Sequence, residues 1–176
     1  IATSANTQNI YEFVHDKMQD ASYLSMTDEK KQFIHYSIGK TYEGSLGYAA
    51  TDRNIYDLVN HYNRSVSFFK SDTEQDKLVE LNVTAGEKAK LSGSYNEAID
   101  YFNVAISLIE KNRLNWTTDV IFNIYLKAGE AAYLKSDFVT SVMYNESALK
   151  YAETNFERAK VHFNFLVMYN SVSDMD

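Results

Sequence analysis

Small and apolar residues recur at helical spacing through most of the chain, and residues 81–108 give the clearest example. The pattern restarts at Gly93, so this stretch predicts two helices joined by a short turn. Small residues lie on the first helix, and bulky apolar residues alternate with small ones on the second. Small positions on one helix can receive bulky side chains from the other. The pattern therefore predicts an antiparallel helical hairpin.

The spacing within this hairpin resembles that of a tetratricopeptide (TPR) repeat. That repeat has a small residue, a glycine, an aromatic, an alanine, a second aromatic and a second alanine at fixed intervals. Six residues match in type and order: Gly86, Gly93, Tyr95, Ala98, Phe102 and Ala105. The resemblance implies a superhelix of stacked hairpins.

A second copy of the pattern begins 43 residues later, where Ala128-Gly129-Glu130 follows Ala85-Gly86-Glu87. The copy is imperfect, because Ser141 and Asn145 stand where the first hairpin has Ala98 and Phe102. We therefore expect the second hairpin to pack less tightly. The extra length between the copies fits a longer connection at 111–118, which Trp116 is expected to cover.

The remaining periodicity predicts about eight helices and an all-α, TPR-like superhelix. The further helices are expected near 9–24, 27–42, 53–69, 118–135, 137–153 and 155–171, with Thr27 and a cap at 71–73 starting two of them. A loop is expected at 43–51, where Gly44 and Gly47 lie among small residues. We expect Gly39 and the helix at 53–69 to form a degenerate hairpin.

The chain divides into two expected parts. Residues 1–70 would hold N-terminal helices and the degenerate hairpin, and residues 71–176 the clear repeats, the last one truncated. The helix at 155–171 is apolar almost all round, so we expect an exposed apolar strip near Phe165 and Tyr169 that favours self-association. The chain starts at Ile1 and ends within an incomplete repeat, which we interpret as a fragment of a larger protein.

Composition supports a helical protein and excludes several partners. The chain has no proline, and 45% of its residues are hydrophobic and 23% charged. The absence of cysteine excludes disulfides and cysteine-ligated metals. A net charge of -7 with scattered basic residues argues against nucleic acid. No apolar run is long enough for a membrane span, so we expect a soluble, cytoplasmic protein.

No catalytic motif emerges from the sequence. A phosphate-binding loop and a G-x-S-x-G nucleophile turn are both absent. The pair His15-Asp16 is the one candidate for a metal-dependent hydrolase, but no further ligands occur at credible spacing. His35 and His61 are expected to be structural histidines. We therefore expect no catalytic residue, no cofactor and no metal in this segment.

A peptide-binding groove is the usual functional surface of this repeat, and the first helix of each hairpin lines it. The ten candidate groove residues are Glu80, Val83, Glu87, Lys90, Leu91, Asn123, Leu126, Glu130, Tyr133 and Leu134. The groove is mixed apolar and acidic, and it lacks the Lys and Asn cluster that would clamp a C-terminal carboxylate. An alternative interpretation is that Leu91, Tyr133 and Leu134 simply pack against neighbouring helices.

Three sequence stretches together resemble one family. They are Phe13-Val14-His15-Asp16 with Gln19 and Ala21, then His35 with Ile38-Gly39, then Leu81-Asn82 with Ala85-Gly86 and Lys88-Ala89-Lys90. In this order they are similar to the helical region that follows the AAA-type, STAND-like ATPase module of large fungal and bacterial hybrid sensor histidine kinases.

This resemblance implies a non-catalytic arm that contacts other domains of its parent chain or a signalling partner. It assigns ATP hydrolysis and phosphotransfer to other domains, with the Phe13–Asp16 helix ending a winged-helix region. Two alternatives stay open: the helical arm of a STAND ATPase transcription regulator of the MalT type, and, with much less support, a hydrolase centred on His15-Asp16.

Overall fold

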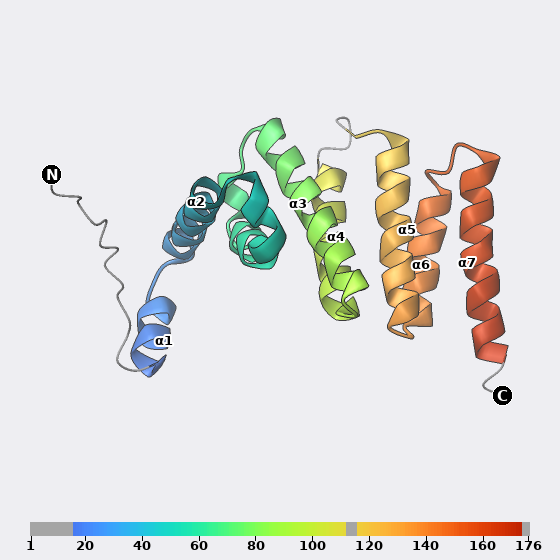
Figure 1. The fold of residues 1–176 in the computed structure, drawn as a ribbon, viewed down its shortest axis with the longest axis horizontal. Helices are drawn as coiled ribbons and strands as arrows, with labels where there is room; N and C mark the ends of the chain where they lie inside the picture. Colours follow the sequence, from blue (N-terminus) through green and yellow to red (C-terminus); the bar gives the residue numbers. More distant parts are fainter. Residues whose placement is uncertain (1–15, 112–115, 174–176) are drawn as a thin grey trace, which may run out of the picture.

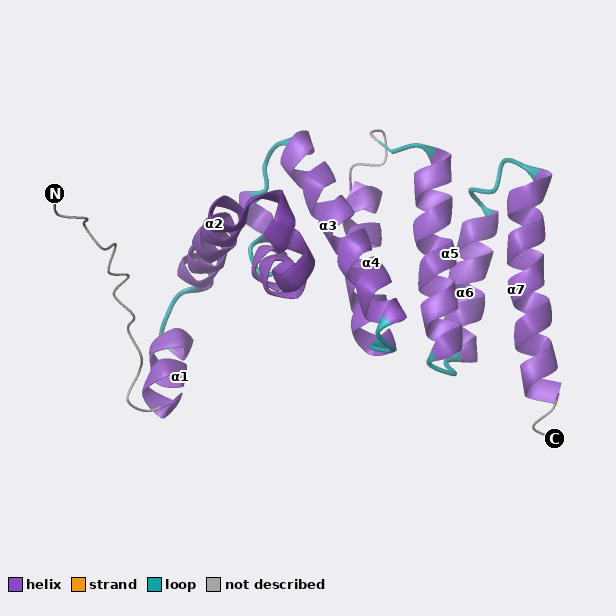
Figure 2. Ribbon diagram, in the orientation of Figure 1, coloured by secondary structure: helices purple, strands orange, loops and turns teal. Residues whose placement is uncertain are grey.

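The computed structural model describes residues 16–111 and 116–173, and within them every regular element is a helix (Figures 1 and 2). The elements are α1 (Asp16–Leu24), α2 (Asp28–Asn63), a short 3-10 helix η1 (Val66–Phe68), α3 (Asp72–Leu91), α4 (Tyr95–Lys111), α5 (Thr118–Leu134), α6 (Phe138–Leu149) and α7 (Asn155–Ser173). The prediction of an all-α chain is confirmed. The predicted helix near 9–24 is described only from Asp16 onward.

Helices α3 to α7 stand side by side in chain order, each packed on the next (Figure 1). Short turns join α3 to α4 and α5 to α6, so each pair forms a hairpin, as the sequence predicted. Figure 1 shows the whole described chain as one row of helices with its two ends far apart. A continuous apolar core runs along this row, from Ile55 in α2 to Val161 in α7.

The helix starts follow from local chemistry. The Ser71 hydroxyl accepts a hydrogen bond from the Glu74 N–H, and the Glu74 carboxylate accepts one from the Ser71 N–H, which completes a capping box at α3. The Thr27 hydroxyl accepts from the Lys30 N–H at α2. The two caps predicted from the sequence are therefore confirmed.

The two hairpin turns share one geometry. Gly93 and Ser136 both have positive φ, +82° and +66°. In each turn the N–H of the next residue, Ser94 or Asp137, donates to a carbonyl five residues earlier at 2.9 Å. This is the Schellman arrangement that ends many helices. Ser136 adopts the backbone conformation that glycine supplies in the first hairpin.

The expected loop at 43–51 is wrong, because the backbone is helical from Asp28 to Asn63. Nevertheless, Nδ1 of His35 lies 2.8 Å from Nδ1 of His61, although a straight helix would separate them by about 39 Å. α2 therefore folds back between a first arm, residues 28–44, and a second arm, residues 55–63. The stretch contains no proline, so the bend has another cause than a proline kink. The predicted helix to residue 69 ends earlier, and η1 follows it.

Gly86 and Gly129 receive a side chain from the neighbouring helix, and Gly39 receives one from the second arm of α2. A Cβ on Gly39 would collide with the Tyr62 ring, one on Gly86 with the Phe102 ring, and one on Gly129 with the Asn145 amide. We call these contacts glycine seats. They make α2 a hairpin of the same kind as the two that follow, as the sequence predicted for Gly39.

Within residues 16–111 and 116–173, no helix combines the length and apolar character that crossing a membrane requires.

Candidate functional site

Ion pairs bridge the two helices that form one half of the predicted groove. Nζ of Lys90 on α3 lies 2.7 Å from the Glu130 carboxylate on α5, and Lys127 pairs with Glu87 in the opposite direction. The two pairs link α3 to α5. Glu87, Lys90 and Glu130 belong to the predicted groove, whereas Lys127 was not predicted. The α3–α5 half of the groove is therefore bridged by charge.

The apolar groove residues have different environments. Leu126 is buried, Val83 is partly buried against the core, and Leu91 is 85% exposed. The interpretation that Leu91 packs against a neighbouring helix is therefore wrong. Leu134, its counterpart on α5, is 46% exposed.

The remaining predicted groove residues are Glu80, Asn123 and Tyr133. Glu80 is exposed on α3, and Asn123 is partly buried near the start of α5, where its amide donates to Asp119. Tyr133 is partly buried on α5, and its hydroxyl lies 2.9 Å from the Ser171 hydroxyl on α7. Tyr133 therefore bridges two helices.

A pocket of about 270 Å³ opens in the α5–α7 half of the groove, between α5, α6 and α7. It contains three predicted groove residues, Glu130, Tyr133 and Leu134. Its other lining residues were not predicted: Gly129, Ser141, Asn145, Phe163, Asn164, Val167 and Met168. We call this the α5–α7 pocket.

Asn145 lies in the second hairpin where Phe102 lies in the first, and it lines the pocket. In the first hairpin the Phe102 ring fills the seat over Gly86 and is fully buried. Asn145 occupies the equivalent seat over Gly129 with a shorter side chain. The expectation that the second hairpin packs less tightly is not confirmed at this seat, because a Cβ on Gly129 would be 2.5 Å from the fully buried Asn145 amide, against 2.7 Å from the Phe102 ring at Gly86.

The inner wall of the pocket is a chain of hydrogen bonds. The Ser141 hydroxyl donates to the Gly129 carbonyl at 2.8 Å, and the Asn145 amide donates to the Ser141 carbonyl at 2.9 Å. The Asn164 amide of α7 donates to Oδ1 of Asn145 at 3.0 Å. Ser141 and Asn145 are fully buried, so these bonds offset the cost of removing two polar side chains from water.

Four large apolar side chains of α7 are exposed: Phe156, Phe163, Leu166 and Tyr169. The strip predicted around Phe165 and Tyr169 therefore exists at Tyr169, but Phe165 is half-buried and packs against the core. Phe163 belongs to this strip and also lines the α5–α7 pocket. The apolar surface of α7 is thus continuous with the pocket.

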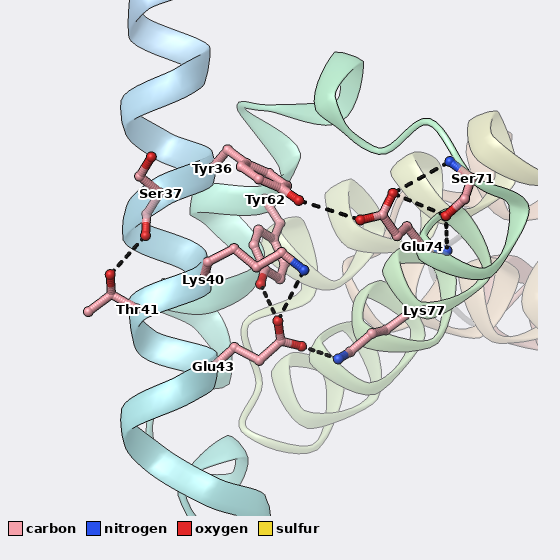
Figure 3. A network of polar contacts seen from close by, with 9 residues as sticks. All are labelled: Tyr36, Ser37, Lys40, Thr41, Glu43, Tyr62, Ser71, Glu74 and Lys77. Carbon is pink, nitrogen blue, oxygen red and sulfur yellow. Dashed lines mark hydrogen bonds and ion pairs between the residues drawn. The ribbon is translucent and has the colours of Figure 1, made fainter.

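A polar network joins α2 to α3 (Figure 3). The Glu43 carboxylate accepts a hydrogen bond from the Tyr62 hydroxyl at 2.8 Å and pairs with Lys40 and Lys77. Burial raises the pKa of Glu43, but the hydrogen bonds from Lys77 and Tyr62 and the charge of Lys40 outweigh burial and lower it. Figure 3 shows the Lys77 side chain on α3 reaching toward Glu43 on α2.

The same view shows a second link between these helices. The Tyr36 hydroxyl donates to the Glu74 carboxylate at 3.4 Å, so the residue that caps α3 is also bonded to α2. Burial and the hydrogen bond to Glu43 strongly raise the pKa of Tyr62, which keeps its hydroxyl protonated. The network therefore fixes the hairpin of α2 against α3.

A histidine pair joins the two arms of α2. His35 is buried, its Nδ1 lies 2.8 Å from Nδ1 of His61, and its Nε2 lies 2.9 Å from the Tyr23 hydroxyl on α1. The Tyr42 ring stacks on His61. Burial lowers the pKa of both histidines. The two histidines thus link the arms of α2 to each other and to α1.

The hydrolase alternative gains no support. His15 lies outside the described residues, so its surroundings are not defined. Across the described ranges, no group of three or more His, Cys, Asp or Glu side chains is placed to hold a metal ion.

The sequence is similar to that of a known signalling protein. Over 168 aligned residues the chain is 31% identical to the hybrid signal transduction histidine kinase G of Dictyostelium discoideum. The alignment covers 81% of this chain but 5% of that relative, so the chain corresponds to a small segment of it. No protein-family model matches the chain, and no solved structure does. The similarity links this chain to hybrid histidine kinases.

Proposed function

We propose that this chain is a TPR-like helical-repeat arm of a hybrid histidine kinase in two-component phosphorelay signalling, and that it binds protein rather than catalysing a reaction. The observation that carries the proposal is the α5–α7 pocket, which opens on the predicted groove face and contains Glu130, Tyr133 and Leu134. The similarity to a segment of such a kinase supports the assignment.

The repeat geometry supports a mechanical role. The glycine seats over Gly39, Gly86 and Gly129 repeat one packing unit, and each helix packs mainly on its sequence neighbours. Such an array forms a right-handed superhelix whose contacts are local, so it bends as a spring. A partner that prefers one curvature of the array shifts its conformational equilibrium, and the parent's activity with it.

The proposed partner is another domain of the parent chain, namely a STAND-type ATPase module, in the cytoplasm. The net charge of -7 disfavours nucleic acid. The exposed strip of α7, from Phe156 to Tyr169, is a second surface through which the chain self-associates. The arm thereby couples the ATPase to the sensor and kinase modules.

The test is a calorimetric titration of this chain with the ATPase segment encoded by the same gene, with and without ATP. Nucleotide-dependent binding is expected. Two leucines provide a matched pair, because Leu91 and Leu134 each end the first helix of a hairpin. Leu134→Asp, at the pocket, should weaken binding of the ATPase segment at least tenfold. Leu91→Asp, in the half of the groove that the ion pairs bridge, should leave this binding unchanged.

Two results contradict the proposal. The first is an absence of binding heat in both nucleotide states, and the second is an equal loss of affinity in the Leu91 and Leu134 variants. The second result places the contact outside the pocket. Sedimentation of the chain alone over a range of concentrations reports self-association, and Leu166→Glu on α7 should reduce it.

A further inference from the structure

Helix α7 is the last in the row, and it has two apolar faces (Figure 1). Val161 and Met168 are buried on the face that packs against the α5–α6 hairpin. On the opposite side of the helix, exposed apolar residues recur at steps of three and four: Phe156, Ala159, Phe163, Leu166 and Tyr169. This is the spacing with which one helix packs along another. We call this second side the outer face of α7.

The contact that closes each hairpin cannot be repeated on the outer face. At Gly39, Gly86 and Gly129 a glycine of the first helix or arm receives a side chain from the second. α7 contains no glycine. It exposes aromatic side chains instead, and these would hold a following helix farther away. The packing unit of the three glycine seats therefore does not continue on α7.

The outer face is complementary to itself when two copies of α7 run antiparallel. With the two-fold axis between residues 162 and 163, Phe156 lies opposite Tyr169 of the second copy. Ala159 then lies opposite Leu166. An aromatic pair thus forms at each end of the contact, and a small residue receives a large one on each side of the axis.

The charges of α7 favour the same orientation. Its charged residues are Glu157, Arg158 and Lys160, and residues 161–173 contain no Lys, Arg, Asp or Glu. In an antiparallel pair the charged end of each helix lies beside the uncharged end of the other. A parallel pair would bring the Lys160 ammonium groups of both copies together, which is unfavourable.

The exposed area on the outer face is sufficient for a dimer. Phe156, Phe163, Leu166 and Tyr169 are each between 62% and 71% exposed. A large apolar side chain has about 200 Å² of surface, so these four expose about 500 Å² on each chain. Pairing two copies would remove about 1,000 Å² from water through these side chains alone, which is the size that a specific interface needs.

We infer that the outer face of α7 binds α7 of a second copy of this chain, antiparallel about a two-fold axis next to Phe163. This inference rests on the proposed function, in which the chain self-associates through α7, and it assigns that association to one contact with one orientation. The dimer carries two α5–α7 pockets, so it can bind a dimeric partner more tightly than one arm does.

The chain has no cysteine, so introduced cysteines report single contacts. Asn155 and Asn170 are exposed polar residues of α7, and the proposed axis places each opposite the other in the two copies. Asn155→Cys and Asn170→Cys, each in the full 176-residue chain, are oxidised with copper phenanthroline alone and as an equimolar mixture. The mixture should form disulfide dimers at least tenfold faster than either variant alone.

The reason is distance. In the antiparallel pair each of these residues is about 22 Å along the helix axis from the same residue of the second copy. A disulfide requires Cα atoms within about 7 Å. Rapid cross-linking of either variant with itself would show a parallel pair and overturn the inference. A mixture that cross-links no faster than its two components also overturns it, and the outer face then has another occupant.

A matched pair of leucines tests the contact itself. Leu166→Glu, introduced into both cysteine variants, should slow cross-linking of the mixture at least tenfold, because it places carboxylates within the apolar contact. Leu91→Glu, at an exposed leucine of α3, is the control and should leave the rate unchanged. An equal effect of the two substitutions contradicts a contact at the outer face.

These experiments need no ATPase segment. Failure of the mixture to cross-link therefore overturns the α7 pairing alone, whereas failure of the calorimetric titration overturns the proposed function.

Discussion

The Phe102 ring lies so close to the backbone of Gly86 that a Cβ added to the glycine would be 2.7 Å from the ring. Phe102 is fully buried at the centre of the row of helices, so its ring has no free space into which to move. The closest approach of α3 and α4 therefore depends on the absence of a side chain at residue 86.

We expect Gly86→Ala to destabilise the chain by about 1–3 kcal/mol, because the added methyl group overpacks a filled core. Gly44→Ala is the matched control: Gly44 is also helical, and nothing lies within 4 Å of an added Cβ there. Alanine favours a helix by up to about 1 kcal/mol over glycine, so the control should be neutral or stabilising. Urea unfolding measures both, and equal effects would contradict the predicted packing.

Ser136 is the one residue other than glycine with positive φ in the described part of the chain, and Gly93 has the same role in the first hairpin. A non-glycine residue in this conformation costs roughly 1 kcal/mol. Ser136→Gly should therefore raise the melting temperature by about 2–4 °C. Gly93→Ser is the reverse substitution and should lower it by a similar amount. A decrease in both variants would show that Ser136 is stabilised by its side chain.

The sequence predicted the two clear hairpins because their signals are local. Gly93 marks a turn that needs positive φ, and the spacing around Gly86 and Gly129 fixes which helix faces meet. Even Ser136 falls at the position that the 43-residue offset from Gly93 assigns to it. The cap at Ser71 depends on residues three positions apart, so it too could be predicted from the sequence.

The fold-back of α2 was not predicted as it occurs. Gly44 and its small neighbours suggested a loop, since sequence alone does not distinguish a bent helix from an interrupted one. Contacts between the arms, such as that of Gly39 with Tyr62, depend on the direction of the bend. The degenerate hairpin itself was predicted from Gly39 and from the apolar residues of the expected helix at 53–69, which begin at Ile55.

The pocket was foreseen only in part. Glu130, Tyr133 and Leu134 were predicted as groove residues from their positions in the repeat, and they line the pocket. The contribution of Phe163, Asn164 and Val167 was missed, because α7 is apolar almost all round and its sequence does not show which face meets α5 and α6. Lys127 was missed for a similar reason, since its pairing with Glu87 depends on the distance between two hairpins.

Glu43→Gln should weaken the attachment of α2 to α3. Its carboxylate accepts a hydrogen bond from Tyr62 and pairs with Lys40 and Lys77, so its pKa is lowered in the folded chain. A lowered carboxyl pKa adds stability that is present at neutral pH and is lost as the pH falls below about 4.5.

We therefore expect a smaller free energy of unfolding at neutral pH in this variant, by about 1 kcal/mol, with less additional loss in acid. Glu80→Gln, at an exposed position of α3, is the control. Urea unfolding near neutral pH and below about pH 4 provides the measurement. An equal acid response in the original chain and in Glu43→Gln would contradict the role given to this carboxylate.

The pair His35–His61 predicts a second loss of stability on acidification, which begins at a higher pH than the loss that involves Glu43. A hydrogen bond between two Nδ1 atoms needs one donor and one acceptor, so the pair is lost when both rings are protonated. For His35, burial lowers the pKa most, followed by the charges of His61 and Arg64. For His61, burial and Arg64 lower the pKa, and Asp57 opposes them.

The sign follows from proton binding. Both pKa values are below 6.5 in the folded chain, so the unfolded chain binds more protons near that pH. The free energy of unfolding is then highest above about pH 6.5 and falls as the pH is lowered, by up to about 1.4 kcal/mol per pH unit for each proton. Besides Arg64 and Asp57, the Tyr23 hydroxyl on α1 contacts His35 and the Tyr42 ring stacks on His61.

Urea unfolding at about pH 7.5 and about pH 5.5 isolates the histidines, because carboxylates titrate mostly below this interval. The original chain should lose stability across it, and His61→Gln should lose clearly less. His162→Gln removes a histidine that is exposed on α7 and is the control, which should respond as the original chain does. If His61→Gln and His162→Gln respond alike, the pair does not hold the two arms of α2 together, and the pH dependence has another origin.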